Sequence, residues 1–165
     1  MCSSDLADLA GPMTFQGTGV IPEKGLYDTV YNWNVKIEMA NGINLVFKPG
    51  GDRTRFIGTD GWIDIRRGGI SASSPEILKI QLGPKDVRLL ESPNHYQNFV
   101  DAVRTRGATV SPLDHAVRSD IISHISDIAV RTKRKITWDP RKEVIVGDAD
   151  ASKMLHRDMR APWTI

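Results

Sequence analysis

The sequence predicts an α+β fold, a mainly antiparallel open β-sheet with helices packed on one face. Residues 13–73 alternate apolar and polar side chains with the period of strands, whereas residues 92–132 carry apolar residues at helical spacing. A sheet that is apolar on one face has to bury that face, and the helices are available to cover it. The 165 residues, of which 40% are hydrophobic, suffice for one domain with a buried core.

The clearest strand spans residues 30–39. Its apolar positions fall on one face: Tyr31, Trp33, Val35, Ile37 and Met39. Asn41-Gly42 follows, a dipeptide that tolerates the positive φ angles of a type I′ turn. Because residues 43–47 resume the alternation, the sequence predicts a β-hairpin over 29–48.

Further strands are expected around this hairpin. Asp60-Gly61 predicts a second hairpin between residues 55–57 and 62–65. Shorter apolar runs predict strands at residues 13–20, 69–73, 86–90, 135–138 and 143–146, and an Asp139-Pro140 turn joins the last two.

The first predicted helix starts at Ser92-Pro93, an N-cap residue followed by proline at the first helical position, and stops at Gly107. Its apolar stripe is Tyr96, Phe99, Val100 and Val103. The second helix begins near Ser111-Pro112 and runs to about Thr132, with the stripe Val117, Ile121, Ile125 and Ile128. A short third helix is expected at residues 149–155.

Composition and charge exclude several classes of function. The net charge of +2 is too small to indicate a nucleic-acid-binding protein, although residues 131–165 carry a net charge of +4. We interpret the basic cluster at residues 131–142 as a solvated helix end rather than a phosphate site. No apolar run approaches the roughly 20 residues of a membrane-spanning helix. Cys2 is the only cysteine, so a disulfide framework and a thiolate metal site are excluded.

No motif in the sequence identifies a type of reaction. Gly17 and Gly19 match the first two glycines of GxGxxG, but Pro22 takes the third position and no helix is expected to follow. Asp120 and His124 have the spacing of two metal ligands on a helix, yet two such residues do not make a metal site. We therefore assign no metal ligand.

The N-terminus has an unusual composition. Residues 2–6 read as the translation of the end of a common sequencing adapter. We expect residues 1–10 to be a non-native leader or a remnant of upstream chain, and residues 11–165 to be the domain. A signal peptide is not visible, so a cytoplasmic location is the default expectation, with the native N-terminus expected upstream.

Several motifs resemble those of one enzyme family. They are the segments Gly25–Thr29, Ala40–Gly42 with Trp33 before it, Phe56–Trp62, Arg67–Gly69, Asn94–Phe99, Ile136–Pro140 and Arg160–Trp163. In order and spacing they look like the C-terminal half of the Gfo/Idh/MocA oxidoreductases, the glucose–fructose oxidoreductase and inositol dehydrogenase family. More narrowly, they are similar to the bacterial branch whose members end in a WDP turn and an R-x-P-W tail. The resemblance runs from about Gly11 to the C-terminus.

The resemblance implies one half of a two-domain enzyme. In this family an N-terminal Rossmann domain binds NAD or NADP, and the C-terminal domain offers an open sheet for substrate and subunit contacts. The implied chemistry is hydride transfer between a sugar or polyol and the nicotinamide. The family's Rossmann fingerprint, its Glu-Lys-Pro lysine and its catalytic Asp and His have no counterpart here. We therefore assign no catalytic and no cofactor-binding residue.

Four residues are candidates for the substrate side. His95 and Asn98 are placed to hydrogen-bond a sugar hydroxyl, with bonds that hold their helix against the sheet as the favoured alternative. Arg67 precedes two glycines and suits a phosphate or carboxylate, with an exposed hairpin end as its favoured alternative. Trp33 suits stacking on a sugar ring, whereas its place in the apolar stripe favours the core or a subunit interface.

Together these observations predict the C-terminal substrate-binding and oligomerisation domain of an NAD(P)-dependent sugar or polyol oxidoreductase, inactive alone. The expected partners are the missing Rossmann domain, a sugar-like small molecule and further copies of the chain through the open sheet face, with neither nucleic acid nor membrane. Two alternatives stay open: a part of an NAD-dependent glycosidase of the same family, or a stand-alone assembly module without catalysis.

Overall fold

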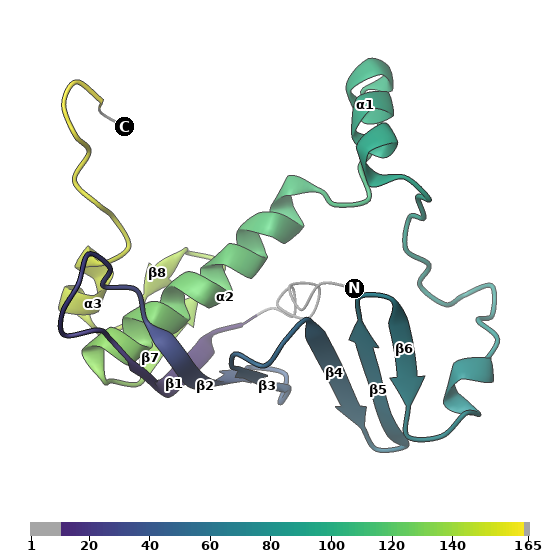
Figure 1. Ribbon diagram of the computed structural model, residues 1–165, viewed down its shortest axis with the longest axis horizontal. Coiled ribbons are helices and arrows are strands. Elements are labelled where there is room, and N and C mark those ends of the chain that lie inside the picture. Colours follow the sequence, from purple (N-terminus) through teal and green to yellow (C-terminus); the bar gives the residue numbers. More distant parts are fainter. Residues whose placement is uncertain (1–10, 164–165) are drawn as a thin grey trace. The chain divides into compact units, whose positions relative to one another are not determined.

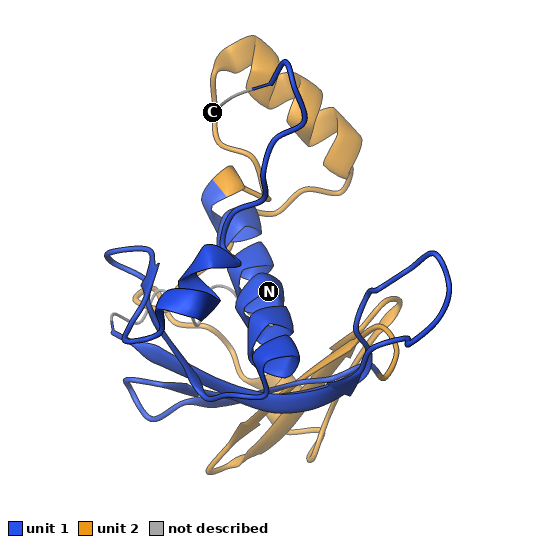
Figure 2. Ribbon diagram, turned by 90° about the vertical axis from the view of Figure 1, so that its left-hand side faces the viewer, with its two compact units in different colours: residues 1–49, 114–165 blue, residues 50–113 orange. Residues whose placement is uncertain are grey.

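The computed structural model describes residues 11–163, which belong to two compact units. One unit comprises residues 1–49 and 114–165, and the other comprises residues 50–113 (Figure 2). The leader predicted at residues 1–10 lies outside the described residues.

The first unit is built on a five-stranded antiparallel sheet. Its strands, in spatial order, are β3 (Asn44–Phe47), β2 (Tyr31–Met39), β1 (Met13–Val20), β7 (Ile136–Asp139) and β8 (Val144–Ile145). The hairpin predicted over 29–48 is confirmed as β2 and β3, and the Gly42 N–H donates to the Met39 carbonyl at 2.9 Å in the turn. Gly42 has a φ of +85°, a left-handed angle that glycine adopts without strain.

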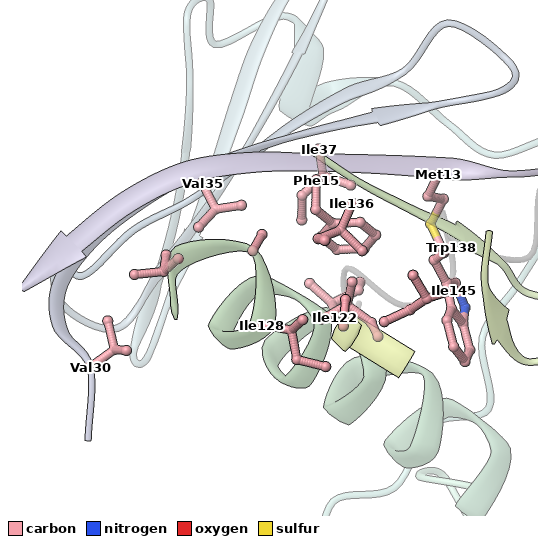
Figure 3. Packing of buried hydrophobic residues seen from close by; sticks show 14 of the residues in the cluster. Met13, Phe15, Val30, Val35, Ile37, Ile122, Ile128, Ile136, Trp138 and Ile145 are labelled. Carbon is pink, nitrogen blue, oxygen red and sulfur yellow. The ribbon is translucent and has the colours of Figure 1, made fainter. Parts of the chain in front are cut away.

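Helix α2 (Leu113–Thr132) covers one face of this sheet (Figures 1 and 3). The sheet contributes Phe15, Ile37 and Ile136 to the core, and the helix contributes Ile125 and Ile128. All five side chains are fully buried. Because full burial of such a side chain stabilises by about 1.5–3 kcal/mol, this cluster holds the helix on the sheet.

The buried stripe of α2 is shorter than predicted. Ile125 is 1% exposed, but Val117 is 46% exposed, so the prediction is confirmed only for the second half of the helix. The first half of α2 leads away from the five-stranded sheet (Figure 1). The third predicted helix is confirmed as α3 (Ala149–Lys153), where the Asp148 side chain accepts the Ala151 N–H at 3.0 Å.

Two glycines of β1 allow close packing within the first unit. A Cβ at Gly17 would stand 2.5 Å from the Asn34 carbonyl oxygen, and a Cβ at Gly19 would stand 2.6 Å from Val30 Cγ1. Glycine in a strand is typical of such close approach. The element after β1 is strand β2 rather than a helix, so this Gly-x-Gly is part of a sheet and not a phosphate-binding turn.

The second unit holds a three-stranded antiparallel sheet. Its strands are β4 (Arg53–Gly58), β5 (Gly61–Arg66) and β6 (Gly69–Ala72), which confirms the second predicted hairpin. The Asp64 carboxylate is buried and pairs with Arg55, whose Nη2 lies 2.8 Å from Asp64 Oδ2. A 3₁₀ turn, η2 (Ile77–Lys79), and helix α1 (His95–Thr105) follow along the chain.

The α+β class is confirmed, and three details differ from the prediction. The antiparallel strands form two sheets rather than one. Residues 86–90 form no strand, because no neighbouring strand pairs with them and Val87 is 86% exposed. The residue that caps α1 is Asn94, whose Oδ1 accepts the Gln97 N–H at 3.0 Å, since the Ser92 hydroxyl donates to a backbone carbonyl instead.

Helix α1 lacks the burial that α2 has. None of its residues is buried in the described part of the chain, and Tyr96 and Phe99 of its apolar stripe are 83% and 62% exposed. The prediction of helices on one face of a sheet is therefore confirmed for α2. In α1 the amphipathic spacing is present, but the apolar side chains are open to solvent.

Candidate functional site

A cavity of about 240 Å³ lies in the first unit between β2, β3 and α2. Its lining is mostly apolar: Val30, Trp33, Val35, Phe47, Ser123, Ser126, Asp127 and Val130. Trp33 and Phe47 form an aromatic wall, with ring centroids 5.4 Å apart and ring planes tilted by 47°. Figure 3 shows Val35, another wall residue, on the face of β2 that looks toward α2. The candidate Trp33 thus contributes to a cavity as well as to the core.

Two residues that line the cavity each have a polar side-chain atom without a hydrogen-bond partner in the described part of the chain. These atoms are Trp33 Nε1 and Ser126 Oγ, and both are buried. Ser126 as a whole is only 2% exposed. A buried polar group without a partner costs about 1–3 kcal/mol.

An ion pair lies on α2 beside the cavity. The Asp127 carboxylate accepts the Arg131 Nε–H at 2.6 Å, and Arg131 Nη2 donates to the Asp28 carbonyl at 2.8 Å. These bonds join α2 to the segment that leads into β2. Because Arg131 offsets the charge of Asp127, the cavity wall carries a carboxylate acceptor without a net charge.

His95 and Asn98 share a surface hollow of about 260 Å³ in the second unit. Its lining is His95, Tyr96, Asn98, Phe99, Val100, Thr109 and Ser111. Asn98 Oδ1 accepts the Val110 N–H at 3.0 Å, so this side chain fixes the segment after α1 rather than joining the helix to the sheet. The lining of the hollow combines hydroxyl groups and aromatic rings, which suits a ligand with both polar and apolar parts.

Arg67 lies at the turn between β5 and β6. Its side chain is 94% exposed and its Nε is 3.0 Å from Asp52 Oδ2. This is the geometry of an exposed hairpin end, and a role in binding an anion stays a prediction. Arg67 is not among the residues that line the hollow at α1, and Trp33 belongs to the other unit. The structure therefore brings together only His95 and Asn98 of the four candidates.

The face of the five-stranded sheet opposite α2 carries a polar cluster that the sequence analysis did not single out. The cluster lines a shallow cavity of about 280 Å³ and consists of Thr14, Gln16, Lys36, Glu38 and Lys135. Glu38 Oε2 accepts from Thr14 Oγ1 at 3.1 Å and lies 3.4 Å from Lys135 Nζ. The Thr14 hydrogen bond, followed by the charge of Lys135, lowers the pKa of the Glu38 carboxyl below its usual 4.5.

The sequence shows most residues of this cluster as the polar positions of the alternating strands. The alternation does not determine how the strands align with one another. In the structure Thr14 stands opposite Glu38 in the β1–β2 pair, and β7 pairs with β1 on its other side. Lys135, just before β7, thereby comes within reach of Glu38. Polar positions of three separate segments meet only through this pairing.

Residues 11–163 contain no cluster of metal ligands. No three His, Cys, Asp or Glu side chains of this range come together in a way that would hold a metal ion. Asp120 and His124 lie one turn apart on α2 without a third such ligand in that range. None of the helices described here is both long enough and apolar enough to cross a membrane.

The described residues thus form an α+β fold with two antiparallel sheets and hollows on its surface. A model of the Gfo/Idh/MocA oxidoreductase family, described as its C-terminal alpha/beta domain, matches residues 23–165. The chain therefore belongs to this oxidoreductase family, in which it corresponds to the C-terminal domain, and the resemblance drawn from the sequence motifs is confirmed. Searches of curated proteins and of solved structures found no match.

Proposed function

We propose that this chain is the substrate-side domain of an NAD(P)-dependent oxidoreductase that acts on a sugar or polyol. The observation that carries the proposal is the family match over residues 23–165. Hydride transfer needs an alcohol carbon held against the nicotinamide, and a second domain is the usual means of holding it. In this proposal the groups that move the proton belong to a Rossmann domain, and the present chain alone is inactive.

The Gly17–Gly19 stretch does not form the glycine-rich turn that holds a dinucleotide. The Gly17–Gly19 stretch is packed against β2, where a neighbouring backbone atom leaves no room even for a Cβ. A pyrophosphate needs a glycine-rich turn that opens a helix, with free N–H groups pointing at the ligand. The proposal therefore places NAD or NADP on the Rossmann domain and derives no step through it here.

The hollow at α1 supports the proposed substrate class. His95, Asn98, Thr109 and Ser111 offer hydrogen-bonding groups to hydroxyls, and the Tyr96 ring offers a face for the apolar side of a sugar. Tyr96 is 83% exposed, so its ring is accessible. In contrast, the cavity at Trp33 has an apolar lining that leaves most hydroxyls of a sugar without partners.

We also propose that copies of the chain associate through the open sheet face. The polar cluster at Glu38 and Lys135 lies on that face, whereas the apolar stripes of the strands lie against α2. Such an interface would be polar and would gain its specificity from paired charges. Sedimentation velocity tests it: a dimer that dissociates in the variant Lys135→Glu supports the interface, and a monomer at high concentration contradicts it.

The test of the enzymatic proposal starts from the source DNA. The reading frame upstream of Met1 is expected to encode a strand–GxGxxG–helix unit and a Glu-Lys-Pro motif. The protein from the whole frame is then assayed for reduction of NAD and NADP with a panel of sugars and polyols. Sugar-dependent reduction supports the proposal. Hydrolysis of nitrophenyl glycosides without net reduction indicates the glycosidase, and a natural start codon at Met1 indicates the assembly module.

The substrate hollow is tested in the same protein with His95→Ala. If His95 binds a sugar hydroxyl, its removal raises KM about tenfold, which is the loss of one hydrogen bond worth about 1.4 kcal/mol, and leaves kcat nearly unchanged. His156→Ala is the matched control, since His156 is also exposed but lies outside the hollow. Equal effects of the two variants would contradict a substrate site at α1.

A further inference from the structure

We propose that one face of the sheet β4–β5–β6 binds a phosphate group, either free or carried by a small molecule. The residues of this arginine face are Arg53, Arg55, Asp64 and Arg66. The inference goes beyond the proposed function, because phosphate binding by this chain needs neither a Rossmann domain nor hydride transfer. None of the four residues lines the hollow at α1, so the failure of either proposal leaves the other standing.

The strand register places the four side chains of the arginine face on one side of the sheet. Arg53 and Arg55 are two residues apart on β4, and Asp64 and Arg66 are two residues apart on β5. Arg55 is the register partner of Asp64, and Arg53 is the register partner of Arg66. Because alternate residues of a strand share a face and directly opposed residues are neighbours, three guanidinium groups lie together over two adjacent strands.

The charge of the arginine face indicates an anion. Three arginines against one aspartate give it a net charge of +2. Arg66 stands directly opposite Arg53, and like charges in this arrangement destabilise a sheet. Within the described residues no carboxylate pairs with Arg66. An anion bound between the two arginines would offset their repulsion, and a phosphate dianion would match the net charge.

A buried carboxylate and an aromatic ring hold Arg55 in place. Asp64 is 3% exposed, and its Oδ2 accepts the Arg55 Nε–H at 2.9 Å and lies 2.8 Å from Arg55 Nη2. Arg55 Cζ lies 4.4 Å from the centroid of the Trp62 ring. Two nitrogens of the guanidinium are thus engaged, and Nη1 keeps its N–H groups for a ligand. Because the side chain is already fixed, binding costs little further conformational entropy.

The geometry of the arginine face favours phosphate over other ligands. A guanidinium group forms two parallel hydrogen bonds with the oxygens of a phosphate or a carboxylate. A carboxylate has only two oxygens and one charge, so it engages fewer of the three arginines than a phosphate does. The side chains of Arg53 and Arg55 are 50% and 39% exposed, so a ligand can reach them from solvent.

The test measures phosphate binding by the full 165-residue chain. The chain is labelled with ¹⁵N and titrated with inorganic phosphate near neutral pH, and the Nε–H resonances of the arginines are observed. We expect saturable shifts at Arg53, Arg55 and Arg66, while Arg104 on α1 stays in place. Sodium chloride and sodium acetate at the same ionic strength are expected to cause no saturable shift.

A second titration distinguishes the two sources of the phosphate group. Glucose 6-phosphate is compared with inorganic phosphate, and glucose serves as the control without a charge. Tighter binding of the ester indicates a phosphorylated small molecule, and equal or weaker binding indicates free phosphate. Both results support the site.

Three variants separate a positioned site from a general attraction of anions. Arg66→Gln should weaken phosphate binding about tenfold, the loss of one charge-assisted hydrogen bond. Arg104→Gln is the matched control, because it removes the same charge from the same unit but outside the sheet, and should change binding less than about twofold. Arg55→Lys keeps the charge but loses the planar group held by Asp64, and should also weaken binding about tenfold.

Urea unfolding shows that the variants fold and adds an independent readout. Without phosphate, Arg66→Gln should unfold at a higher urea concentration than the unmodified chain, because it removes the repulsion with Arg53. Phosphate should raise the midpoint of the unmodified chain and leave that of Arg66→Gln nearly unchanged.

Three results would overturn the proposal. They are the absence of a saturable shift with phosphate, equal shifts with phosphate and chloride, or equal effects of Arg66→Gln and Arg104→Gln. Shifts that appear with an oligonucleotide but with neither inorganic phosphate nor glucose 6-phosphate would indicate a nucleic-acid surface, and this too would overturn it.

Discussion

Trp33 on β2 and Phe47 on β3 meet across the hairpin, with their ring centroids 5.4 Å apart. Phe47 is the register partner of Val35, so its contact with Trp33 is a diagonal one, two residues along the strand. The pair forms one wall of the cavity under α2. It links the most regular part of the sequence, the alternating strand, to this cavity.

A double-mutant cycle measures this pair. We expect Trp33→Leu and Phe47→Leu each to destabilise the chain, and the cycle to give a coupling free energy of about 1 kcal/mol, because tilted aromatic pairs contribute beyond their buried area. Urea unfolding of the four proteins checks it. The control cycle replaces Phe47→Leu by Val46→Ala, since Val46 is 52% exposed on the adjacent position of β3. Additivity of the Trp33–Phe47 cycle would contradict the contact.

Gly17 should not tolerate a side chain. Gly17→Ala places a Cβ 2.5 Å from the Asn34 carbonyl oxygen, so β1 and β2 have to separate locally. We expect a loss of about 1–3 kcal/mol in the free energy of unfolding. Gly50→Ala is the matched control, because a Cβ at Gly50 meets nothing within 4 Å. Equal midpoints of denaturation for the two variants would refute this account of the β1–β2 contact.

Glu38 should titrate below its usual range. The folded-state pKa is lowered, so Glu38 contributes stability that is present above pH 4.5 and is lost as the pH falls through the folded pKa. Carboxyl ¹³C NMR is expected to show a pKa below 4.5 that rises in Thr14→Val and in Lys135→Gln, the two partners of Glu38. Thr18→Val, at another exposed position of β1, should leave it unchanged. A Glu38 pKa at or above 4.5 in the unmodified chain would count against the cluster.

Removal of the Ser126 hydroxyl should stabilise the chain. Ser126→Ala deletes a buried polar atom without a partner and places a better helix former in α2, so we expect a gain of about 1 kcal/mol. Thermal unfolding checks the direction, with Ser123→Ala expected to have a smaller effect because Ser123 is exposed. A loss of stability in Ser126→Ala would mean that the hydroxyl has a partner within the fold.

Much of the first unit can be predicted from local patterns. The alternation at residues 31–39 and the Asn41-Gly42 turn predict β2 and β3, since each depends on neighbouring residues alone. The cavity could not be predicted in this way. It depends on which half of α2 lies over the sheet, and the helical periodicity runs equally through Val117, which is exposed, and Ile125, which is buried.

The second unit shows the same limit. The spacing of Tyr96 and Phe99 predicts an amphipathic helix, and α1 forms, but a periodicity does not state what covers its apolar side. Residues 86–90 have strand-like composition, and whether a strand forms is decided by the presence of a pairing partner. The pair His95 and Asn98 can be predicted because the two residues are close in the sequence. The polar cluster at Glu38 cannot be predicted in this way, because it depends on the register of the sheet.

The most direct test of the central claim is isothermal titration of the 165-residue chain with NAD and with NADP. The claim is that this chain is a substrate-side domain and that the nicotinamide cofactor belongs to another domain. It predicts no specific heat of binding for the chain alone, and saturable binding for the protein encoded by the whole reading frame. Saturable binding of either dinucleotide by the 165-residue chain would contradict it.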